Sequence, residues 1–150
     1  MSTNRSELPL VHLALLIMET ANAMENAARR AFRPHRLSPA QFNVLNLLAT
    51  SDDGMRAGDL AQKLVVHPSN VTRLLQKLRR DGLVAQLDRP ADRREVVVAL
   101  TPPGRVRWSK AHREYQEALR VFDRAVSPAA GRRGAVVLQR LRDVSHELFH

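Results

Sequence analysis

The chain has 150 residues, of which 44% are hydrophobic and 26% charged, a balance typical of one soluble domain with a buried core. It has no cysteine, which excludes disulfide bonds, thiol catalysis and cysteine-ligated zinc and fits a reducing, cytoplasmic location. Its 24 basic and 15 acidic residues give a formal net charge of +9, which favours an anionic partner, although a solvated basic surface explains the charge equally well.

The first predicted helix covers residues 9–32 and ends before Pro34. An apolar run at residues 8–18 overlaps its start. The small residues that follow at positions 21–23 imitate a signal-peptide cleavage site. Secretion is disfavoured because Arg5 is the only basic residue before the run. A membrane span is disfavoured separately, because it needs about 20 apolar residues and this run is shorter. A helix that is apolar nearly all round is usually buried on several sides, so we interpret it as part of a subunit interface.

Two shorter helices are predicted next. Ser38-Pro39-Ala40-Gln41 forms a capping box with proline at the first helical position, and Phe42, Leu45 and Leu48 then follow on one face. The sequence TSDDGM is predicted to be a loop. A third helix at residues 57–64 buries Leu60, Ala61 and Leu64, although Arg56 is a poor cap for its start.

The fourth predicted helix begins at Pro68 and ends at Asp81-Gly82. Its apolar face repeats at helical spacing, with Val71, Leu74, Leu75 and Leu78 within about 100° of arc. Its opposite face is rich in hydrogen-bond donors. Taken alone, such a helix is usually a plain surface helix. Because a short helix and a three-residue turn come directly before it, the pattern is that of a helix-turn-helix, whose second helix enters the DNA major groove.

A β-hairpin is predicted after this helix. Residues 83–87 alternate in character, and Val96, Val98 and Leu100 alternate on the return. The tip between them carries Arg89, Arg93 and Arg94, and arginine suits both narrow minor grooves and bidentate phosphate contacts. Such arginines could serve solubility alone, but beside a helix-turn-helix they indicate a wing that contacts DNA.

Two more helices are predicted after the hairpin, and both carry apolar stripes. The first stripe follows Pro103 and consists of Trp108, Tyr115, Leu119, Phe122 and Val126. The second follows Ser127-Pro128 and consists of Val137, Leu141, Val144 and Leu148. Gly131 and Gly134 weaken the start of the last helix by about 1 kcal/mol each relative to alanine. Since residues 38–101 already hold a core of their own, we interpret both terminal regions as a dimer interface.

No motif for catalysis or metal binding is present. The six histidines are scattered without an HExxH motif, and neither a glycine-rich phosphate loop nor GxSxG occurs. The pair His146 and His150 has helical spacing, but its position at the C-terminus favours incidental pairing over zinc. We therefore expect no enzyme, no cofactor and no metal. The alternative to a specific regulator is a basic architectural protein that binds any DNA by charge.

The chain resembles the MarR family of transcriptional regulators from end to end. The resemblance is carried by LSPAQFNVLNLLA, by GDLAQKLVVHPSNVTRLLQKLRRDGLV and by DRPADRREVVVALTPPG. It implies a mainly α-helical fold with a small β-hairpin wing, in which a winged helix-turn-helix at residues 38–101 lies between dimerisation helices at 1–37 and 102–150. It also implies a homodimer that binds a palindromic DNA operator, commonly as a repressor.

The resemblance and the polar face of the fourth helix together name the candidate DNA contacts. We expect base and phosphate contacts from the reading helix, through Ser69, Asn70, Thr72, Arg73, Gln76 and Lys77. In the wing, Arg94 matches the family's minor-groove arginine and Asp92 the acid that positions it, with Arg89 and Arg93 beside them. Side chains that read base edges are unnecessary in a purely electrostatic binder, which disfavours the architectural alternative.

Many members of the family release DNA when a small phenolic or aromatic carboxylate anion binds where the dimer helices meet the winged helix-turn-helix at residues 38–101, which we call the reading head. Here the polar candidates for such a pocket are His12, His35, Asn43 and His112. The apolar residues expected around them are Met18, Phe42 and Trp108. A satisfied core or surface residue is the alternative for each histidine. The resemblance to the peroxide-sensing members is incomplete, because no N-terminal cysteine is present.

Overall fold

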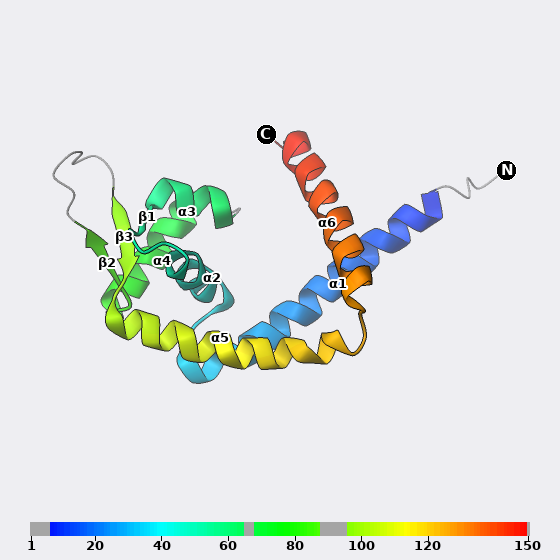
Figure 1. Cartoon of the computed structure of the whole chain (residues 1–150). Coiled ribbons are helices and arrows are strands. Elements are labelled where there is room, and N and C mark those ends of the chain that lie inside the picture. The colour runs from blue at the N-terminus through cyan, green and yellow to red at the C-terminus, as the bar shows by residue number, and fades with distance from the viewer. Residues whose placement is uncertain (1–6, 65–67, 88–95, 150) are drawn as a thin grey trace. The chain divides into compact units, whose positions relative to one another are not determined.

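The computed structural model describes residues 7–64, 68–87 and 96–149 (Figure 1). The chain divides into two compact units, residues 1–115 and 116–150. The helices are α1 (Glu7–Phe32), the 3-10 helix η1 (Arg33–His35), α2 (Pro39–Ala49), α3 (Ala57–Leu64), α4 (Pro68–Arg80), α5 (Pro102–Asp123) and α6 (Pro128–Phe149). The strands are β1 (Met55–Arg56), β2 (Val84–Leu87) and β3 (Val97–Leu100). The mainly α-helical fold with a small sheet is thus confirmed.

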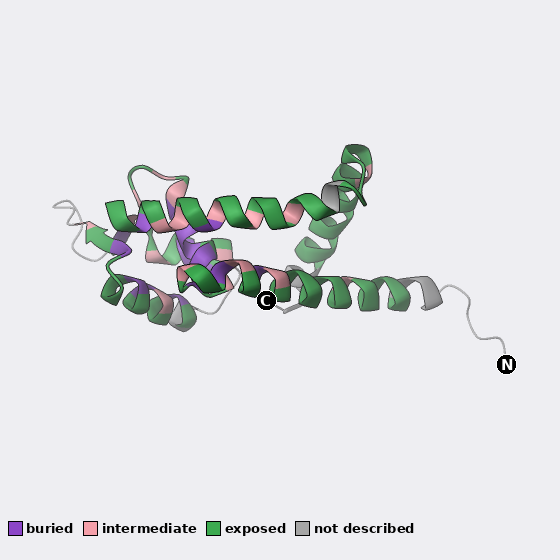
Figure 2. Ribbon diagram, turned by 90° about the horizontal axis from the view of Figure 1, so that it is seen from below, coloured by how far each residue is buried: buried purple, intermediate pink, exposed green. Residues whose placement is uncertain are grey.

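Helix α1 has two parts with different surroundings. Its C-terminal end joins the core of the first unit, where Ala28 and Phe32 are buried. Its preceding turns expose large apolar side chains such as Leu15 and Met18. Figure 2 shows this contrast as a green helix that turns purple only near its end. Among the described residues, no helix is both long and apolar enough to cross a membrane.

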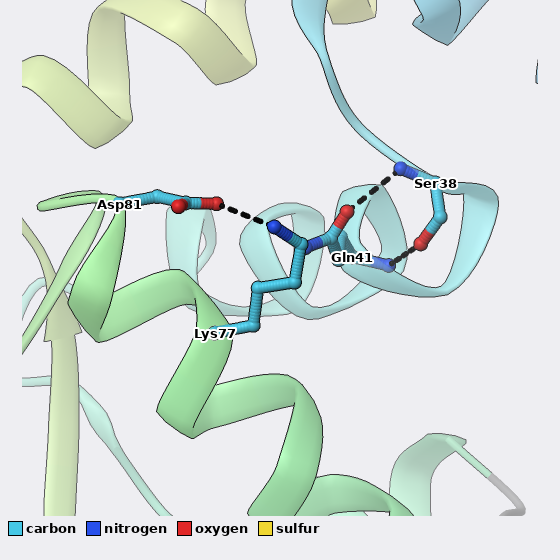
Figure 3. A network of polar contacts seen from close by, with 4 residues as sticks. All are labelled: Ser38, Gln41, Lys77 and Asp81. Carbon is cyan, nitrogen blue, oxygen red and sulfur yellow. Dashed lines mark hydrogen bonds and ion pairs between the residues drawn. The ribbon is translucent and has the colours of Figure 1, made fainter.

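Helix α2 begins with the predicted capping box. The Ser38 hydroxyl accepts a hydrogen bond from the Gln41 amide at 3.1 Å, and the Gln41 side chain accepts one from the Ser38 amide at 2.9 Å (Figure 3). These two bonds satisfy donors that a helix start otherwise leaves free. The helix then buries Phe42, Val44 and Leu45, which form the centre of the core.

The sheet has three antiparallel strands in the order β1-β3-β2, one more than predicted. The loop prediction for TSDDGM was wrong at its end, because Met55 pairs with Val98. This pairing also completes the start of α3, since the Ala57 amide donates to the Val96 carbonyl oxygen at 3.1 Å. The sheet therefore supplies the partner that Arg56 cannot supply as a cap.

The predicted alternation in β3 was wrong as well. Val97 and Val98 are both buried, whereas Val96 is exposed. Strand β3 is the central strand, so β1 and β2 pair with its two edges. Consecutive residues of a strand point to opposite faces, so the burial of both Val97 and Val98 means that both faces are covered near its start. A strand buried on both faces shows a continuous apolar run instead of a period of two.

The end of α4 and the start of α5 are held together by short polar contacts. The Thr101 hydroxyl donates to the Gly82 carbonyl oxygen at 2.6 Å and accepts from the Gly104 amide at 3.1 Å. Gly104 permits this approach, because a Cβ there would lie 1.9 Å from the Leu83 carbonyl oxygen. Gly82 has a φ of 69°, the left-handed conformation that ends a helix, as predicted.

The second unit contains the end of α5 and the whole of α6. Helix α6 continues through Gly131 and Gly134, so the glycines do not interrupt it. Its start is capped by Ser127, whose hydroxyl accepts from the Ala130 amide at 3.3 Å. Its described apolar side chains are exposed, with Val137 at 47%, Leu138 at 51% and Val144 at 53%.

Candidate DNA-binding interface

Helices α3 and α4 form the helix-turn-helix, and the apolar core fixes both. Leu60 and Ala61 anchor α3, while Val71, Leu75 and Leu78 anchor α4. Leu64 and Leu74, which the sequence also assigned to the core, are only partly buried at its edge. The turn between the helices lies outside the described residues. Because its inner face is locked in the core, α4 presents its other face rigidly to solvent.

The outer face of α4 carries the predicted reading residues. Asn70, Thr72, Arg73, Gln76 and Lys77 are all exposed. The side chain of Ser69 lies outside what the structure describes. Within the described ranges, Arg73 and Gln76 have no hydrogen bond or ion pair, so their donors remain available for a ligand.

Lys77 differs from the other reading residues because it already has a partner. Its Nζ lies 3.3 Å from the Asp81 carboxylate one turn later (Figure 3). Both side chains are partly exposed, so the pair contributes at most about 1 kcal/mol to stability and can open toward a phosphate.

Arg79 was not among the predicted contacts. Its guanidinium lies 3.3 Å from the Gln86 side-chain oxygen of β2, where it joins the recognition helix to the wing. The sequence offered a signal, because Arg79 follows the apolar Leu78 in the last turn of α4. Its partner, however, depends on the sheet register.

The wing is described only at its base. Strands β2 and β3 pair from Val84 with Leu100 to Leu87 with Val97. The predicted wing residues Arg89, Asp92, Arg93 and Arg94 fall between the strands and lie outside the described residues. Their roles therefore remain predictions.

Two of the four predicted effector residues are partly buried, and two are exposed. His112 is partly buried, with its ring 6.3 Å from that of Phe42 and 5.1 Å from that of Trp108. His35 is also partly buried, and its Nε2 lies 2.9 Å from Glu114 of α5. His12 and Asn43 are exposed on α1 and α2.

Each of the two partly buried histidines has a buried ring nitrogen that lacks an aligned hydrogen-bond partner among the described residues. His112 Nδ1 and His35 Nε2 are both buried and have no aligned hydrogen-bond partner among the described residues, so the His35–Glu114 contact is close without being a hydrogen bond. Trp108 is satisfied, because its Nε1 donates to Asn46 at 3.1 Å. In the part of the chain that the structure describes, no three histidine or acidic side chains gather into a metal site.

Comparisons with known proteins place this geometry in a family. The family model described as "MarR family" matches residues 37–96, which span the reading head and the wing. The "Transcriptional activatory protein BadR" of Rhodopseudomonas palustris is 36% identical over 94 residues, 61% of this chain and 54% of that protein. The chain thus spans about half the length of that relative.

Two other relatives are matched over most of their length. The "Homoprotocatechuate degradative operon repressor" of Escherichia coli is 28% identical, over 74% of each chain. The "Uncharacterized HTH-type transcriptional regulator YsmB" of Bacillus subtilis is 30% identical, over 75% of this chain and 78% of that protein.

Solved structures share the fold. A mutant of MarR from E. coli, complexed with operator DNA, superposes with a TM-score of 0.79 at 22% identity, over 89% of this chain and 95% of that chain. The M. tuberculosis regulator MOSR, in complex with DNA, superposes with a TM-score of 0.72 at 27% identity, over 88% of this chain and 96% of that chain. Family members are transcription regulators and not enzymes, as expected here. The chain belongs to the MarR family of winged helix-turn-helix transcriptional regulators.

Proposed function

We propose that the chain is a homodimeric, sequence-specific regulator that binds a palindromic operator, acting as a repressor. The observation that carries the proposal is the outer face of α4, where Arg73 and Gln76 are exposed and unpaired among the described residues. Guanidinium and amide groups are the side chains that read guanine and adenine edges in the major groove. The relative named as an operon repressor supports repression, while the relative named as an activatory protein supports activation.

The exposed apolar side chains of α1 and α6 support the dimer. Each helix leaves several large apolar residues uncovered within the single chain, including Leu16 on α1 and Val136 on α6. Apolar surface of this extent is typical of an interface. Two copies would place one recognition helix in each half-site, with centres about 10 base pairs apart.

The test of the DNA-binding proposal is a gel shift on a palindrome found upstream of the gene or of its divergent neighbour. We expect a single dimeric complex that survives a large excess of random duplex. Equal affinity for the palindrome and for random DNA would favour the architectural alternative.

The dimer is tested by sedimentation of the wild type and of Val137→Glu. This substitution buries a charge only if α6 lies in an interface, and in that case it should weaken the dimer.

We further propose that an aromatic anion regulates operator binding at the face formed by α2, η1 and α5. His35 and His112 supply buried polar atoms without aligned partners, and Phe42 and Trp108 supply aromatic surface beside His112. Such a combination suits an aromatic carboxylate or phenolate. The relative named for a homoprotocatechuate degradative operon supports this ligand class. His12 and Asn43 are exposed in the single chain and remain candidates for contacts to this ligand.

The effector proposal is tested by titrating salicylate into the protein–operator complex at constant ionic strength, so that counterion release does not imitate release by the ligand. Operator affinity should fall, and DNA should weaken salicylate binding by the same factor. If neither operator affinity nor the melting temperature of the free protein changes, salicylate is not a ligand of this site.

A further inference from the structure

A shallow groove of about 620 Å³ lies between η1 and the first turns of α5. Its floor is apolar and is formed by Pro34, Pro102, Pro103 and Val106. The volume lies within the range of small-molecule sites, which is about 300–1,000 Å³. The two segments that line it are far apart in sequence, so the fold creates the groove.

Three of the residues that line the groove are cations. Arg36, Arg107 and Lys110 line it, and no carboxylate does. None of the three makes an ion pair with any residue that the structure describes. One carboxylate lies beside the groove, because Glu114 is 2.9 Å from Nε2 of the lining residue His35, while Asp52 lies 3.7 Å from Arg105. Three unpaired cations around one hollow attract a ligand with two or more negative charges.

The backbone around the groove is arranged before any ligand binds. Arg36 has a φ of 55° and is the only described residue other than glycine with a positive φ. Residues other than glycine rarely adopt this backbone conformation. Here it is held by hydrogen bonds from the Arg36 amide to the Arg33 carbonyl oxygen and from the Leu37 amide to the Phe32 carbonyl oxygen. The three prolines restrict the floor further. A site that is already ordered loses less entropy when it binds.

The groove does not lie at the base-reading end of α4. The contacts from Thr101 to Gly82 and from Gly104 to Leu83 attach the start of α5 to the C-terminal end of α4. Recognition helices contact bases mainly with their N-terminal residues, and the 13 residues of α4 span about 18 Å. Base reading at the N-terminal end of α4 therefore does not explain the groove cations, although Arg107 and Lys110 on α5 are also candidates for contacts to DNA phosphates.

We propose that this groove binds an organic phosphate of the nucleotide type. Two phosphoryl groups would contact Arg36, Arg107 and Lys110, and a flat apolar portion would lie on the floor formed by the prolines and Val106. Arginine binds phosphoryl oxygens through paired hydrogen bonds. A single carboxylate has too few oxygens to make such bonds with all three cations.

The test is calorimetric titration of ADP and of inorganic pyrophosphate into the DNA-free full chain at fixed ionic strength. Trp108 is the only tryptophan and directly follows Arg107, so its fluorescence gives a second readout. The apolar floor predicts that ADP binds more tightly than pyrophosphate. Because no DNA is present, failure of the operator-binding proposal would leave this result unaffected.

The variant is Arg107→Gln with Lys110→Gln, and its matched control is Arg113→Gln with Arg133→Gln. Both pairs remove two exposed or partly exposed helical cations and insert a good helix former, so only the position differs. We expect the groove pair to weaken ADP binding at least about tenfold and the control pair less than about twofold. Val106→Glu should also abolish binding, by placing an acid on the floor.

Three results would overturn the proposal. Equal losses from the two pairs would show that ADP responds only to the general positive charge. Equal affinity for ADP and pyrophosphate would exclude an organic ligand on the apolar floor. A loss of random-duplex affinity from the groove pair, without an effect on ADP, would assign these cations to DNA phosphates.

Discussion

The reading head and the last helix of this chain have similarly apolar sequences but different surroundings. Leu78 of α4 is fully buried by neighbours in the same chain, whereas Leu138 of α6 is 51% exposed. Periodicity therefore predicts a helix in both places but does not predict what covers it. The elements that pack against α4 in the reading head are α2, α3 and β2. In α6 the structure shows none among the described residues of its own unit, which is why we propose a second copy.

The largest effect should come from the same substitution made at one glycine in each region. Gly104→Ala places a methyl group 1.9 Å from the Leu83 carbonyl oxygen, so the backbone must move, at a cost of about 4 kcal/mol or more. Gly134→Ala meets no atom within 4 Å and should stabilise α6 by about 0.5–1 kcal/mol. Denaturant unfolding of the two variants measures both changes. Similar losses at both glycines would contradict the comparison.

The next effect concerns the leucines. Leu78→Ala leaves a cavity in a core that cannot fully collapse and should cost about 2–5 kcal/mol. Leu138→Ala should cost within about 0.5 kcal/mol in dilute protein, because its side chain is half exposed in the single chain. If α6 lies in a dimer interface, the cost at Leu138 should rise with protein concentration. Melting curves at two concentrations separate the two cases.

A smaller effect is expected for DNA affinity. Arg73→Ala should weaken operator binding by about 1–3 kcal/mol and relax the preference at one base pair. Arg133→Ala removes the same charge from α6 and should change affinity only through the general field, by less than about 0.5 kcal/mol. Equilibrium binding to operator and to random duplex measures both. Equal losses of Arg73→Ala on the two duplexes would show that Arg73 contacts phosphate only.

The smallest difference concerns the helix caps. Ser38→Ala removes one bond of a reciprocal pair and should destabilise the first unit by about 1 kcal/mol. Ser127→Ala removes a single exposed bond of 3.3 Å and should cost about half as much. Thermal unfolding of both variants gives the ratio. A larger loss at Ser127 would mean that α6 is held more tightly than its exposure in the single chain indicates.

Much of the fold could be predicted from local signals. The capping box at Ser38 and the apolar spacing of Val71, Leu75 and Leu78 are confirmed, because they depend on residues within a few turns of one helix. Strand β1 could not be predicted, since two residues carry no periodicity and Met55 pairs with Val98 far along the chain. The exposure of Val96 and burial of Val97 depend on the same pairing.

The candidate sites were predictable to different degrees. The outer face of α4 follows from its apolar face, so Arg73 and Gln76 were identified correctly as exposed. The groove of Arg36, Arg107 and Lys110 was not identified, because η1 and α5 meet only in three dimensions. The partial burial of His35 and His112 likewise depends on contacts made only in three dimensions. Sequence could propose these histidines but could not separate them from the exposed His12.

The two-residue strand β1 also has a consequence for self-association. Residues 96–100 form an uncharged apolar run that begins with three β-branched valines, the kind of run that pairs with copies of itself when a strand edge is open. In the fold, β1 covers one edge of β3 at Val97 and Val98, while β2 covers the other. Gly54, with a φ of 76°, allows the chain to turn into β1. Loosening that turn would uncover an edge of β3 that templates aggregation, and it would also remove the hydrogen bond from the Ala57 amide to the Val96 carbonyl oxygen at the start of α3.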